Sequence, residues 1–516
     1  MMKTIVFLIM GLAAWAATLE VRPGDSIQSA IDKAKAGDTV LIHAGTYRER
    51  VRVDKDGIVV SGAPGEDAVI TGADLIPAGE WEQVAGKPVW RHTPWKYRGP
   101  THPNDDFHRL IGRTEQVILD GKLMKQVLQM EQMEPGTFYA DPGTALFVRL
   151  SGDAAPAGHT IEASVRALLM EITGSHVAVR HLRFLYGCNP AQRSVLAIEG
   201  SDNLVEDCIT EWTNGCGARL NGERNTARRL VSRFNGQMGM GAQGVHNVME
   251  ECRLEGNNVK GYRKGWEAGG IKVVMTQGFV IRRCQAVRND GPGFWFDIDN
   301  RDGLVENSYS AENFGAGFFA EISGPVTIRN NLAVRNGLKD EPGSWCNAGI
   351  LLGEAMHCVV EHNISVGNRH GIEVRQQRIR EAGSRGPSRE KRCYSDGHVF
   401  RDNIAAFNKE YQFAVFGDNT FFGAKKEVSP EDLELLNPDK RGWRAENNLY
   451  FAAPGEGLIL WGAKWLPKHL EYRDLKTFQA EHHLEQGSKV ADPLFVNWEA
   501  GDFKLKPGSP AEKLLQ

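Results

Sequence analysis

Two carboxylates stand at the same offset from a glycine in neighbouring segments. Asp297 is the fourth residue after Gly293 in GPGFWFD, and Glu321 is the fourth after Gly317 in GAGFFAE. If the two segments are stacked strands, both acids face the same side and lie roughly 5 Å apart. A retaining glycosidase holds its nucleophile and its acid/base about 5 to 5.5 Å apart, whereas an inverting one needs about 6.5 to 9.5 Å. The spacing therefore indicates hydrolysis of a glycosidic bond with retention.

The side chains between the glycines and the acids alternate in direction. Residues one and three after each glycine, among them Phe294 and Phe318, are expected to point into a core, and residues two and four to point outward. Trp295 and Phe319 then flank the acids and are predicted to form an aromatic platform for a sugar. Two like charges so close are costly to ionise together, so one carboxyl group should hold a proton and act as the general acid.

Further polar residues are expected near this pair. Glu267, in KGWEAGGIKV just before the strand of the preceding coil, is a third catalytic candidate or a solvated corner acid. The residues predicted to bind substrate are Lys272, Trp295, Asp299, Phe319, Glu373 and Arg375, and the same face carries Arg219, Asn221 and Gln243 in earlier coils. The alternatives for the pair itself are a Ca²⁺ site and an ordinary polar surface. We assign no metal site and no cofactor.

A repeat supplies the stacking that the acid pair needs. Segments such as LVEDC, VMEEC, VIRRC and LVENS recur at intervals between 22 residues (Cys208 to Leu230) and 40 residues (Asn363 to Asn403). Most continue with a short apolar run and an asparagine: Asn235, Asn257, Asn289, Asn313, Asn336, Asn368 and Asn408. Short strands with Asn/Gly corners and 57 glycines are typical of a β-solenoid. We interpret the asparagines as a structural ladder between coils.

The chain ends and one interruption complete the predicted architecture. Residues 17–77 form an N-terminal cap and the first coils, with a capping signal at Asp25 or Ser26 and a short amphipathic helix that ends near Gly37. Residues 78–166 lose the corner repeat and contain Trp81, Trp90 and Trp95, which predicts an inserted β-sandwich. Residues 167–516 are the main parallel β-helix with a C-terminal segment of strands and turns. The fold class is all-β.

The N-terminus predicts export. Residues 1–16 contain a lysine, an apolar run and Ala14-Trp15-Ala16, which fits a signal peptide and its cleavage site. No later stretch is apolar enough for a membrane span. Cys208, Cys252 and Cys284 recur at one point of the repeat and are expected to form a buried, reduced stack. The remaining cysteines are candidates for one or two disulfides: Cys188, Cys216, Cys346, Cys358 and Cys393.

The net charge of the chain and one basic segment indicate which kinds of molecule the protein could bind. A formal net charge of −4 gives no basic face for nucleic acid. The basic segment 378–397, RIREAGSRGPSREKRCYSDG, is either a solvated loop or a lid that faces a saccharide. The expected partner is an oligo- or polysaccharide, and the oligomeric state is open.

Two segments resemble known families. PGDSIQSAIDKAKAGDTVLIHAGTY is similar to the N-terminal cap of right-handed parallel β-helix proteins that act on polysaccharides. EAGGIKV, GPGFWFDIDNRDGLVENSYSAEN and GFFAEISGPVTIRNNLAV resemble the active-site region of glycoside hydrolase family 120, the β-helix β-xylosidases. The resemblance implies an inserted β-sandwich, a nucleophile at Asp297, an acid/base at Glu321 and a third acid at Glu267. It departs at Ile298, where the family commonly has tryptophan, and at Ser323, where a histidine is expected.

The sequence thus predicts an exported glycoside hydrolase that acts on plant or algal oligo- or polysaccharides with retention. One alternative is a lyase or epimerase for uronic-acid polysaccharides, with Lys272 or Arg375 as base and Ca²⁺ on Asp297, Asp299 and Glu321. Another is a glycan-binding protein without catalysis, because a β-helix hosts all three roles.

Overall fold

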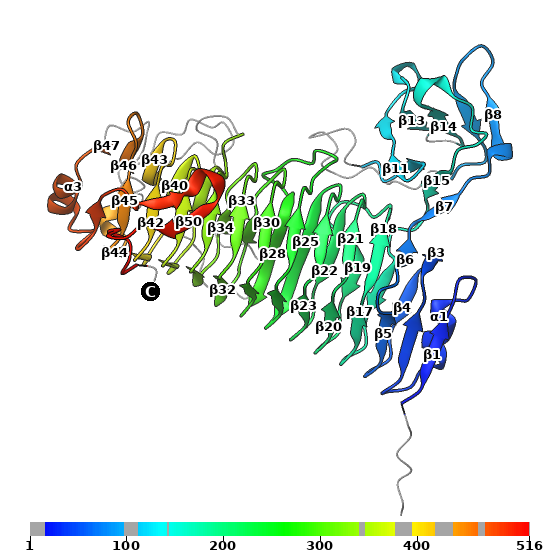
Figure 1. The fold of residues 1–516 in the computed structure, drawn as a ribbon, viewed down its shortest axis with the longest axis horizontal. Coiled ribbons are helices and arrows are strands. Elements are labelled where there is room, and N and C mark those ends of the chain that lie inside the picture. Colours follow the sequence, from blue (N-terminus) through cyan, green and yellow to red (C-terminus); the bar gives the residue numbers. More distant parts are fainter. Residues whose placement is uncertain are drawn as a thin grey trace, which may run out of the picture.

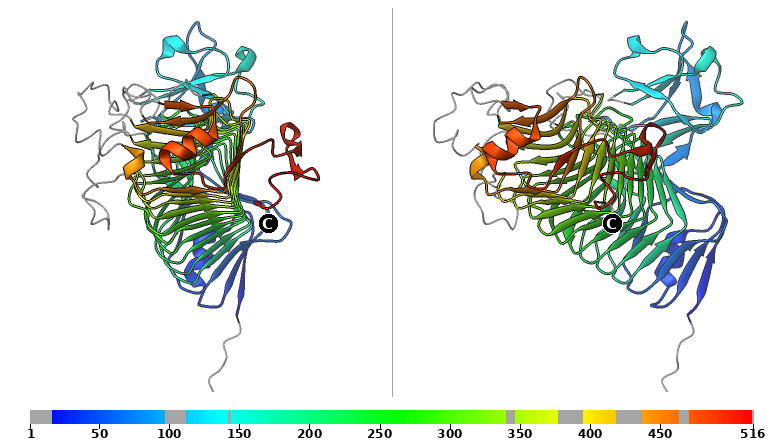
Figure 2. Two further views of the ribbon diagram at one scale, coloured as in Figure 1. Left: turned by 90° about the vertical axis from the view of Figure 1, so that its left-hand side faces the viewer. Right: turned by 60° about the vertical axis from the view of Figure 1, so that its left-hand side comes forward.

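A computed structural model describes residues 16–96, 112–141, 144–339, 346–376, 395–417, 437–462 and 470–514. Three 13-stranded sheets run the length of a solenoid, which lies horizontally in Figure 1. The chain passes from sheet 1 to sheet 2 to sheet 3 in each coil, and the strands pair in parallel with those of the next coil. The end-on view shows these strands as stacked walls (Figure 2). The predicted all-β parallel β-helix is confirmed.

The strands of each sheet are short, as expected for a repeat of this length. Sheet 1 contains β1 (Thr18–Val21), β2 (Thr39–Ile42), β5 (Val59–Gly62), β17 (Ala178–Arg180), β20 (Leu204–Glu206), β23 (Thr226–Arg228), β26 (Val248–Glu250), β29 (Val280–Arg282), β32 (Gly303–Glu306), β35 (Val326–Arg329), β38 (Val359–Glu361), β41 (Val399–Arg401) and β44 (Arg444–Glu446). Sheet 2 contains β3 (Gly45–Tyr47), β6 (Ala68–Thr71), β18 (Leu182–Leu185), β21 (Ile209–Glu211), β24 (Val231–Arg233), β27 (Arg253–Glu255), β30 (Gln285–Val287), β33 (Tyr309–Ala311), β36 (Leu332–Val334), β39 (Ile364–Val366), β42 (Ile404–Ala406), β45 (Leu449–Phe451) and β48 (Lys489–Val490). Sheet 3 contains β4 (Val51–Val53), β16 (Met170–Ile172), β19 (Ser194–Ile198), β22 (Cys216–Leu220), β25 (Met238–Val245), β28 (Gly269–Gln277), β31 (Phe294–Asp297), β34 (Phe318–Glu321), β37 (Ala348–Gly353), β40 (His370–Gln376), β43 (Tyr411–Gly417), β46 (Gly457–Trp461) and the antiparallel β47 (Leu470–Tyr472).

A β-sandwich interrupts the solenoid between β6 and β16, at the upper right of Figure 1. One of its sheets holds β7 (Ala73–Leu75), β10 (Val117–Leu119), β11 (Lys122–Leu123) and β15 (Ile161–Ser164), and the other holds β8 (Trp81–Gln83), β9 (Trp90–His92), β12 (Lys125–Val127), β13 (Thr137–Ala140) and β14 (Leu146–Arg149). Trp81, Val117, Phe138 and Ile161 share one buried cluster between the two sheets. The insert therefore has a core of its own, as the sequence predicts.

A short helix covers each end of the solenoid. Helix α1 (Ile27–Lys33) starts at Ser26, whose hydroxyl accepts a hydrogen bond from the Ser29 amide, and buries Ile27 and Ile31 in the main core. Helix α3 (Leu475–His482) buries Leu475 and Phe478 in the same core at the other end. Beyond it, β49 (Phe495–Asn497) and β50 (Asp502–Leu505) form a hairpin outside the solenoid. The short 3₁₀ turns are Ala78–Glu80, Met130–Gln132, Ser151–Asp153, Pro438–Lys440 and Trp498–Ala500.

The corners follow the predicted ladders. The Asn235 side-chain amide donates to Asn257 Oδ1 at 3.0 Å, and the same contact links each later asparagine through to Asn408. The seven cysteines in the described residues are all buried, and no disulfide joins any two of them, so the predicted disulfides among Cys188, Cys216, Cys346 and Cys358 are not formed. The Cys252 amide donates to Cys284 Sγ at 3.4 Å. The predicted stack is confirmed for Cys252 and Cys284, whereas Cys208 is buried but separated from Cys252 by Leu230 of the intervening coil. Cys393, residues 1–15 and most of the basic loop lie outside the described residues.

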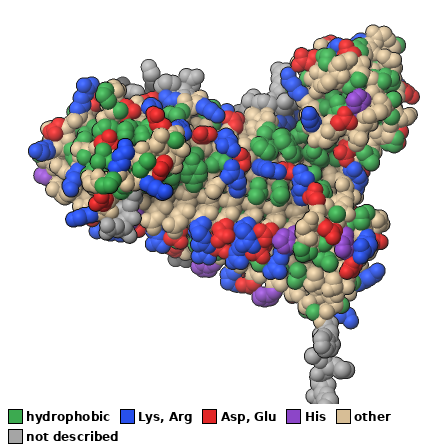
Figure 3. Space-filling view, viewed as in Figure 1, with side chains coloured by type: hydrophobic (Ala, Val, Ile, Leu, Met, Phe, Trp, Pro, Cys, Tyr) green, Lys and Arg blue, Asp and Glu red, His purple; other side chains and the backbone are tan. Residues whose placement is uncertain are grey.

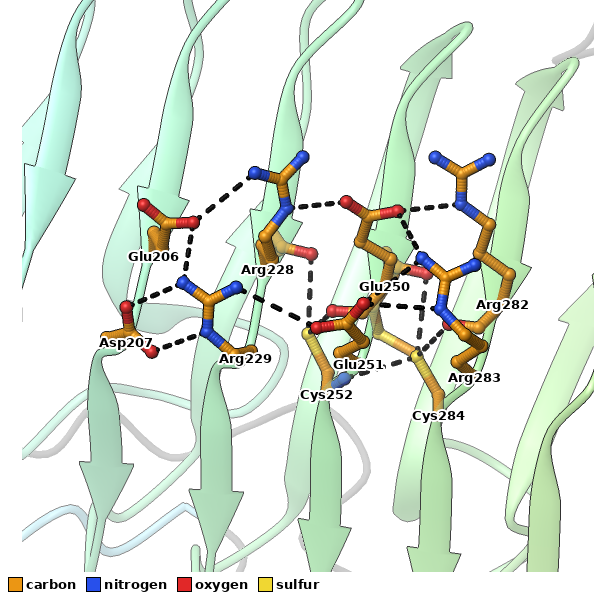
Figure 4. Close-up of polar contacts among 12 residues, drawn as sticks. Glu206, Asp207, Arg228, Arg229, Glu250, Glu251, Cys252, Arg282, Arg283 and Cys284 are labelled. Carbon is orange, nitrogen blue, oxygen red and sulfur yellow. Dashed lines mark hydrogen bonds and ion pairs between the residues drawn. The ribbon is translucent and has the colours of Figure 1, made fainter.

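The outer face of sheet 1 carries a ladder of charges that alternate in sign. Its members, paired in register from strand to strand, are Arg180, Glu206, Arg228, Glu250, Arg282, Glu306, Arg329, Glu361, Arg401 and Glu446. Figure 3 shows basic and acidic side chains gathered in a band along the lower middle of the solenoid, where Figure 1 has strands of sheet 1. In Figure 4, Glu250 lies between Arg228, at 2.5 Å, and Arg282, at 2.7 Å. Opposite charges on neighbouring strands stabilise a sheet.

In the part of the chain that the structure describes, no helix has the length and apolar character needed to cross a membrane.

Candidate active site

Asp297 and Glu321 occupy directly opposed positions at the ends of β31 and β34 in sheet 3. Phe294, Phe296 and Phe318 point into the main core, while Trp295 and Phe319 belong to a separate cluster on the other side of the sheet. The alternation predicted from the two glycines is therefore confirmed. Among the paired strand positions of the described residues, Asp297 and Glu321 are the only two directly opposed side chains of like charge.

Lys272, in the preceding strand β28, supplies a counter-charge for Asp297. Its Nζ lies 2.8 Å from Asp297 Oδ2, donates to the Trp266 carbonyl oxygen at 2.6 Å and sits 4.0 Å from the centre of the Trp295 ring. Burial disfavours the charged ammonium, but the carboxylates of Asp297, Glu267 and Glu321 outweigh this and raise the pKa of Lys272. Lys272 is thus held as a cation beside the acid pair.

The second oxygen of Asp297, Oδ1, is buried and has no hydrogen-bond partner among the residues that the structure describes. A buried carboxylate oxygen without a donor is costly in a fold that satisfies nearly all its polar groups. Lys272 therefore fixes Oδ2 of Asp297, and Oδ1 is left without a donor from the described residues.

Glu321 is held by an aromatic side chain. The Trp295 Nε1–H group donates to Glu321 Oε2 at 3.2 Å. The Trp295 and Phe319 rings stack with their centroids 5.4 Å apart and their planes 15° apart. Lys272 covers the other face of Trp295, and both aromatic residues are 1% exposed.

The predicted sugar platform of Trp295 and Phe319 is therefore wrong. Each face of the Trp295 ring already contacts a protein group, and the spacing of the two rings leaves no room for a sugar between them. The rings pack in an apolar cluster with Ala316, Cys346, Ala348 and Leu351. Their place is beneath the acids, where Trp295 orients Glu321 and supports Lys272.

Glu267 precedes β28 and lies on the same side of the pair as Lys272 and Arg219. Burial raises the pKa of the Glu267 carboxyl group, and the charges of Lys272 and Arg219 offset part of this effect. A side-chain hydrogen bond from Gln192 also holds it. The structure therefore brings Glu267 into the electrostatic environment of Asp297, as the sequence predicts, and adds Gln192 and the Trp266 carbonyl group, which the sequence analysis did not identify.

The other predicted substrate residues lie elsewhere. Glu373 and Arg375 are in register with Phe319 and Glu321, two coils further on. They form a buried ion pair of 2.8 Å with 0% and 4% exposure. Asp299 lies at the corner after β31 and lines a cavity of about 300 Å³ with Gln277, Arg301, Ser323 and His357. The structure thus joins Glu267, Lys272, Asp297 and Glu321, and separates Glu373 and Arg375 from them.

The site is nearly enclosed on one flank and more open on the other. Asp297, Glu321 and Lys272 are 4%, 6% and 8% exposed. Towards the C-terminus, Trp295, Phe319 and Leu351 are fully packed. Towards the N-terminus, the half-exposed side chains are Gln192, Arg219, Gln243 and Glu267. Within the described residues, no group of three or more His, Cys, Asp or Glu side chains is arranged to hold a metal ion.

Comparisons with known proteins agree with the fold. A family model described as "Right handed beta helix region" matches residues 194–365. The solved structure of XylC with xylose is similar with a TM-score of 0.64 and 16% identity over 87% of each chain. A structure described as a glycoside hydrolase is similar with a TM-score of 0.50 and 10% identity over 81% of this chain and 100% of that chain. A search of curated proteins found no significant match. The chain is a right-handed parallel β-helix protein.

Proposed function

We propose that this protein is a glycoside hydrolase that cleaves its substrate with retention of anomeric configuration. The observation that carries the proposal is the direct opposition of Asp297 and Glu321 in neighbouring strands. Strands in a sheet lie about 4.8 Å apart, so the register favours the short carboxyl separation of a retaining enzyme over the wider one of an inverting enzyme.

The two acids take different roles because their partners differ. Lys272 balances the charge of Asp297, so Asp297 acts as the carboxylate nucleophile and Glu321 carries the proton that the first step requires. An Asp297 oxygen attacks the anomeric carbon, the glycosidic C–O bond breaks, and Glu321 gives its proton to the leaving oxygen. Glu321 then takes a proton from water, which attacks the same carbon and releases Asp297.

Two likenesses to other proteins bear on the class of sugar. The resemblance to glycoside hydrolase family 120, together with the similarity to XylC solved with xylose, makes aryl β-xylosides the first substrates to test. Export to the periplasm or medium, inferred from residues 1–16, fits an enzyme that meets oligo- or polysaccharides outside the cell.

The lyase or epimerase alternative fits the site less well. A basic catalyst works best with a pKa near the working pH, whereas the pKa of Lys272 is raised. Arg375 is occupied by Glu373 in a buried ion pair. The mechanism that uses either residue as a base therefore has no support from these contacts.

A panel of aryl glycosides tests the proposal. The wild-type protein should release the phenol from at least one of them, and Asp297→Ala should lower kcat/KM by on the order of 10⁴-fold or more while circular dichroism stays unchanged. Azide, a small external nucleophile, should restore part of the activity of this variant. Full activity of Asp297→Ala would refute the assignment, and glycan binding without turnover by the wild type would favour the non-catalytic alternative.

A further inference from the structure

Arg219 lies in β22 of sheet 3, on the N-terminal side of the acid pair, and its charge acts on Glu267. It is in register with Gly241 and Lys272 in the next two strands. A Cβ atom at Gly241 would lie 3.6 Å from Arg219 Nη1 and 3.8 Å from Arg219 Cζ. The guanidinium group therefore lies over Gly241, at a distance at which a Cβ atom would make ordinary van der Waals contact with it.

The guanidinium group is anchored by neutral partners only. Arg219 Nη1 donates to the Gln192 carbonyl oxygen at 2.9 Å, and Nε donates to Asn221 Oδ1 at 3.3 Å. Arginine has five N–H donors, so three remain without a protein acceptor in the part of the chain that is described. No carboxylate of the described residues lies within 4 Å of Arg219, although Arg228 and Arg282 on sheet 1 each have one.

The surroundings leave this cation available to a ligand. Asp297 is engaged by Lys272, and Glu321 accepts from Trp295. Glu267, on which the charge of Arg219 acts, has a raised pKa because it is buried, and Glu199 accepts a hydrogen bond from Asn221 rather than from Arg219. Arg219 and Gln192 are half-exposed and lie on the open flank, whereas the opposite flank is filled by Trp295, Phe319 and Leu351.

We infer that Arg219 binds a carboxylate of the substrate, so that the sugar entering the site is a uronic acid. A planar guanidinium group with adjacent free donors matches a carboxylate in a bidentate arrangement, which a hydroxyl group cannot reproduce. Gln192 and Asn221 orient the arginine through the two hydrogen bonds that it donates. This inference rests on the proposed hydrolysis for its place in a reaction, but the binding site itself does not.

Matched substrates isolate the carboxylate. A 4-nitrophenyl β-D-glucuronide differs from the corresponding β-D-xyloside by the carboxylate on C5, and a galacturonide tests the other common ring configuration. Wild-type kcat/KM should be higher for one of the uronides than for the xyloside. In Arg219→Gln the ratio of uronide to xyloside kcat/KM should fall roughly 10- to 100-fold, and Arg219→Lys, which keeps the charge without the planar fork, should restore part of it. Arg193→Gln, an exposed arginine near the same flank, is the control that should leave the ratio unchanged.

Two results would overturn the inference. One is a wild-type preference for the neutral xyloside, and the other is an equal loss on both substrates in Arg219→Gln, which would indicate a structural arginine. If the wild type hydrolyses no aryl glycoside, the proposed function fails, and calorimetric titration with glucuronic and galacturonic acids and with xylose then decides the inference separately. Binding of a uronic acid that is lost in Arg219→Gln supports it, and binding of xylose alone refutes it.

Discussion

On the outer face of sheet 1, each charged residue of the ladder faces the opposite charge in the next strand, whereas on the outer face of sheet 3 Asp297 faces Glu321. Both faces come from the same repeat and the same parallel register. On sheet 1 the charges are matched by arginines within 2.5 to 3.3 Å of Glu206 and Glu250. On sheet 3 the two acids rely on Lys272 and on a tryptophan N–H group.

The difference separates structural charges from functional ones. Opposite charges across strands stabilise a sheet and like charges weaken it, so a fold under pressure for stability alone would alternate them everywhere. The ladder on sheet 1 shows that this chain alternates positive and negative side chains over many coils. A like-charged pair in the same solenoid therefore indicates a chemical requirement that opposes stability, as active sites often do.

Replacing one acid of the pair should separate activity from stability most strongly. Glu321→Gln removes the acid/base and should lower kcat/KM roughly 10²- to 10⁴-fold. The free energy of unfolding should not fall, because Gln is neutral like the protonated Glu321 and its amide oxygen can still accept from Trp295. Initial rates and urea denaturation measure the two effects, and a variant that is fully active or strongly destabilised would contradict the comparison.

Removing the cation should have the next largest effect. Lys272→Met leaves the buried Asp297 carboxylate without its partner and should lower the free energy of unfolding by about 3–5 kcal/mol. Lys264→Met, which breaks the half-exposed 3.3 Å pair with Asp290, is the matched control and should cost about 1 kcal/mol or less. Urea titrations that give equal losses for the two variants would show that the sheet 3 pair does not depend on Lys272.

The same Glu-to-Gln change on sheet 1 should act in the opposite way. Glu250→Gln should lower the free energy of unfolding by about 1.5–3 kcal/mol at pH 7 and leave kcat/KM unchanged. Burial opposes the charge on Glu250, but hydrogen bonds from Arg228 and Arg282 prevail and lower its pKa. Its stabilisation is therefore present above about pH 4.5, the ordinary glutamate pKa, and is lost as the pH falls through the folded-state pKa. A penalty that stays constant down to pH 2 would argue against ladder stabilisation.

Glu267 should show the reverse pH dependence and the smallest effect. Because its pKa is raised, the folded state binds its proton more tightly than the unfolded state, and stability falls as the pH rises from about 4.5 through the folded-state pKa. Glu267→Gln should therefore melt at a higher temperature than the wild type at pH 7, and the difference should vanish below about pH 4.5. A variant less stable than the wild type at pH 7 would place Glu267 among the structural acids.

Local patterns in the sequence were sufficient for the architecture and for the pairing of the acids. Asparagines recur at the same corner of successive repeats, and this predicts a ladder in which each side chain bonds the next coil. The equal offsets from Gly293 and Gly317 predict that Asp297 lies opposite Glu321 in the neighbouring strand. The alternating ladder can also be read from the sequence, where the pairs Glu206-Asp207, Arg228-Arg229, Glu250-Glu251 and Arg282-Arg283 stand at the same point of successive repeats.

The surroundings of the pair could not be predicted in the same way. The alternation of side chains along a strand predicts that Trp295 and Phe319 point outward, but it does not predict which residues cover them. Their burial depends on Cys346 and on segments of irregular length such as residues 259–268. The same non-local packing brings the Trp266 carbonyl group and Gln192 to Lys272 and Glu267. A sequence pattern that repeats once per coil gives the position of each residue within its coil, but not the contacts that loops make with other coils.

The most direct test of the central claim is the anomeric configuration of the first product, followed by proton NMR during hydrolysis of an aryl glycoside by the wild-type protein. An adjacent pair with Asp297 as nucleophile predicts that the initial sugar keeps the configuration of the substrate, with the other anomer appearing later through mutarotation. Initial release of the inverted anomer would require room for a water between the carboxyl groups and would contradict the account.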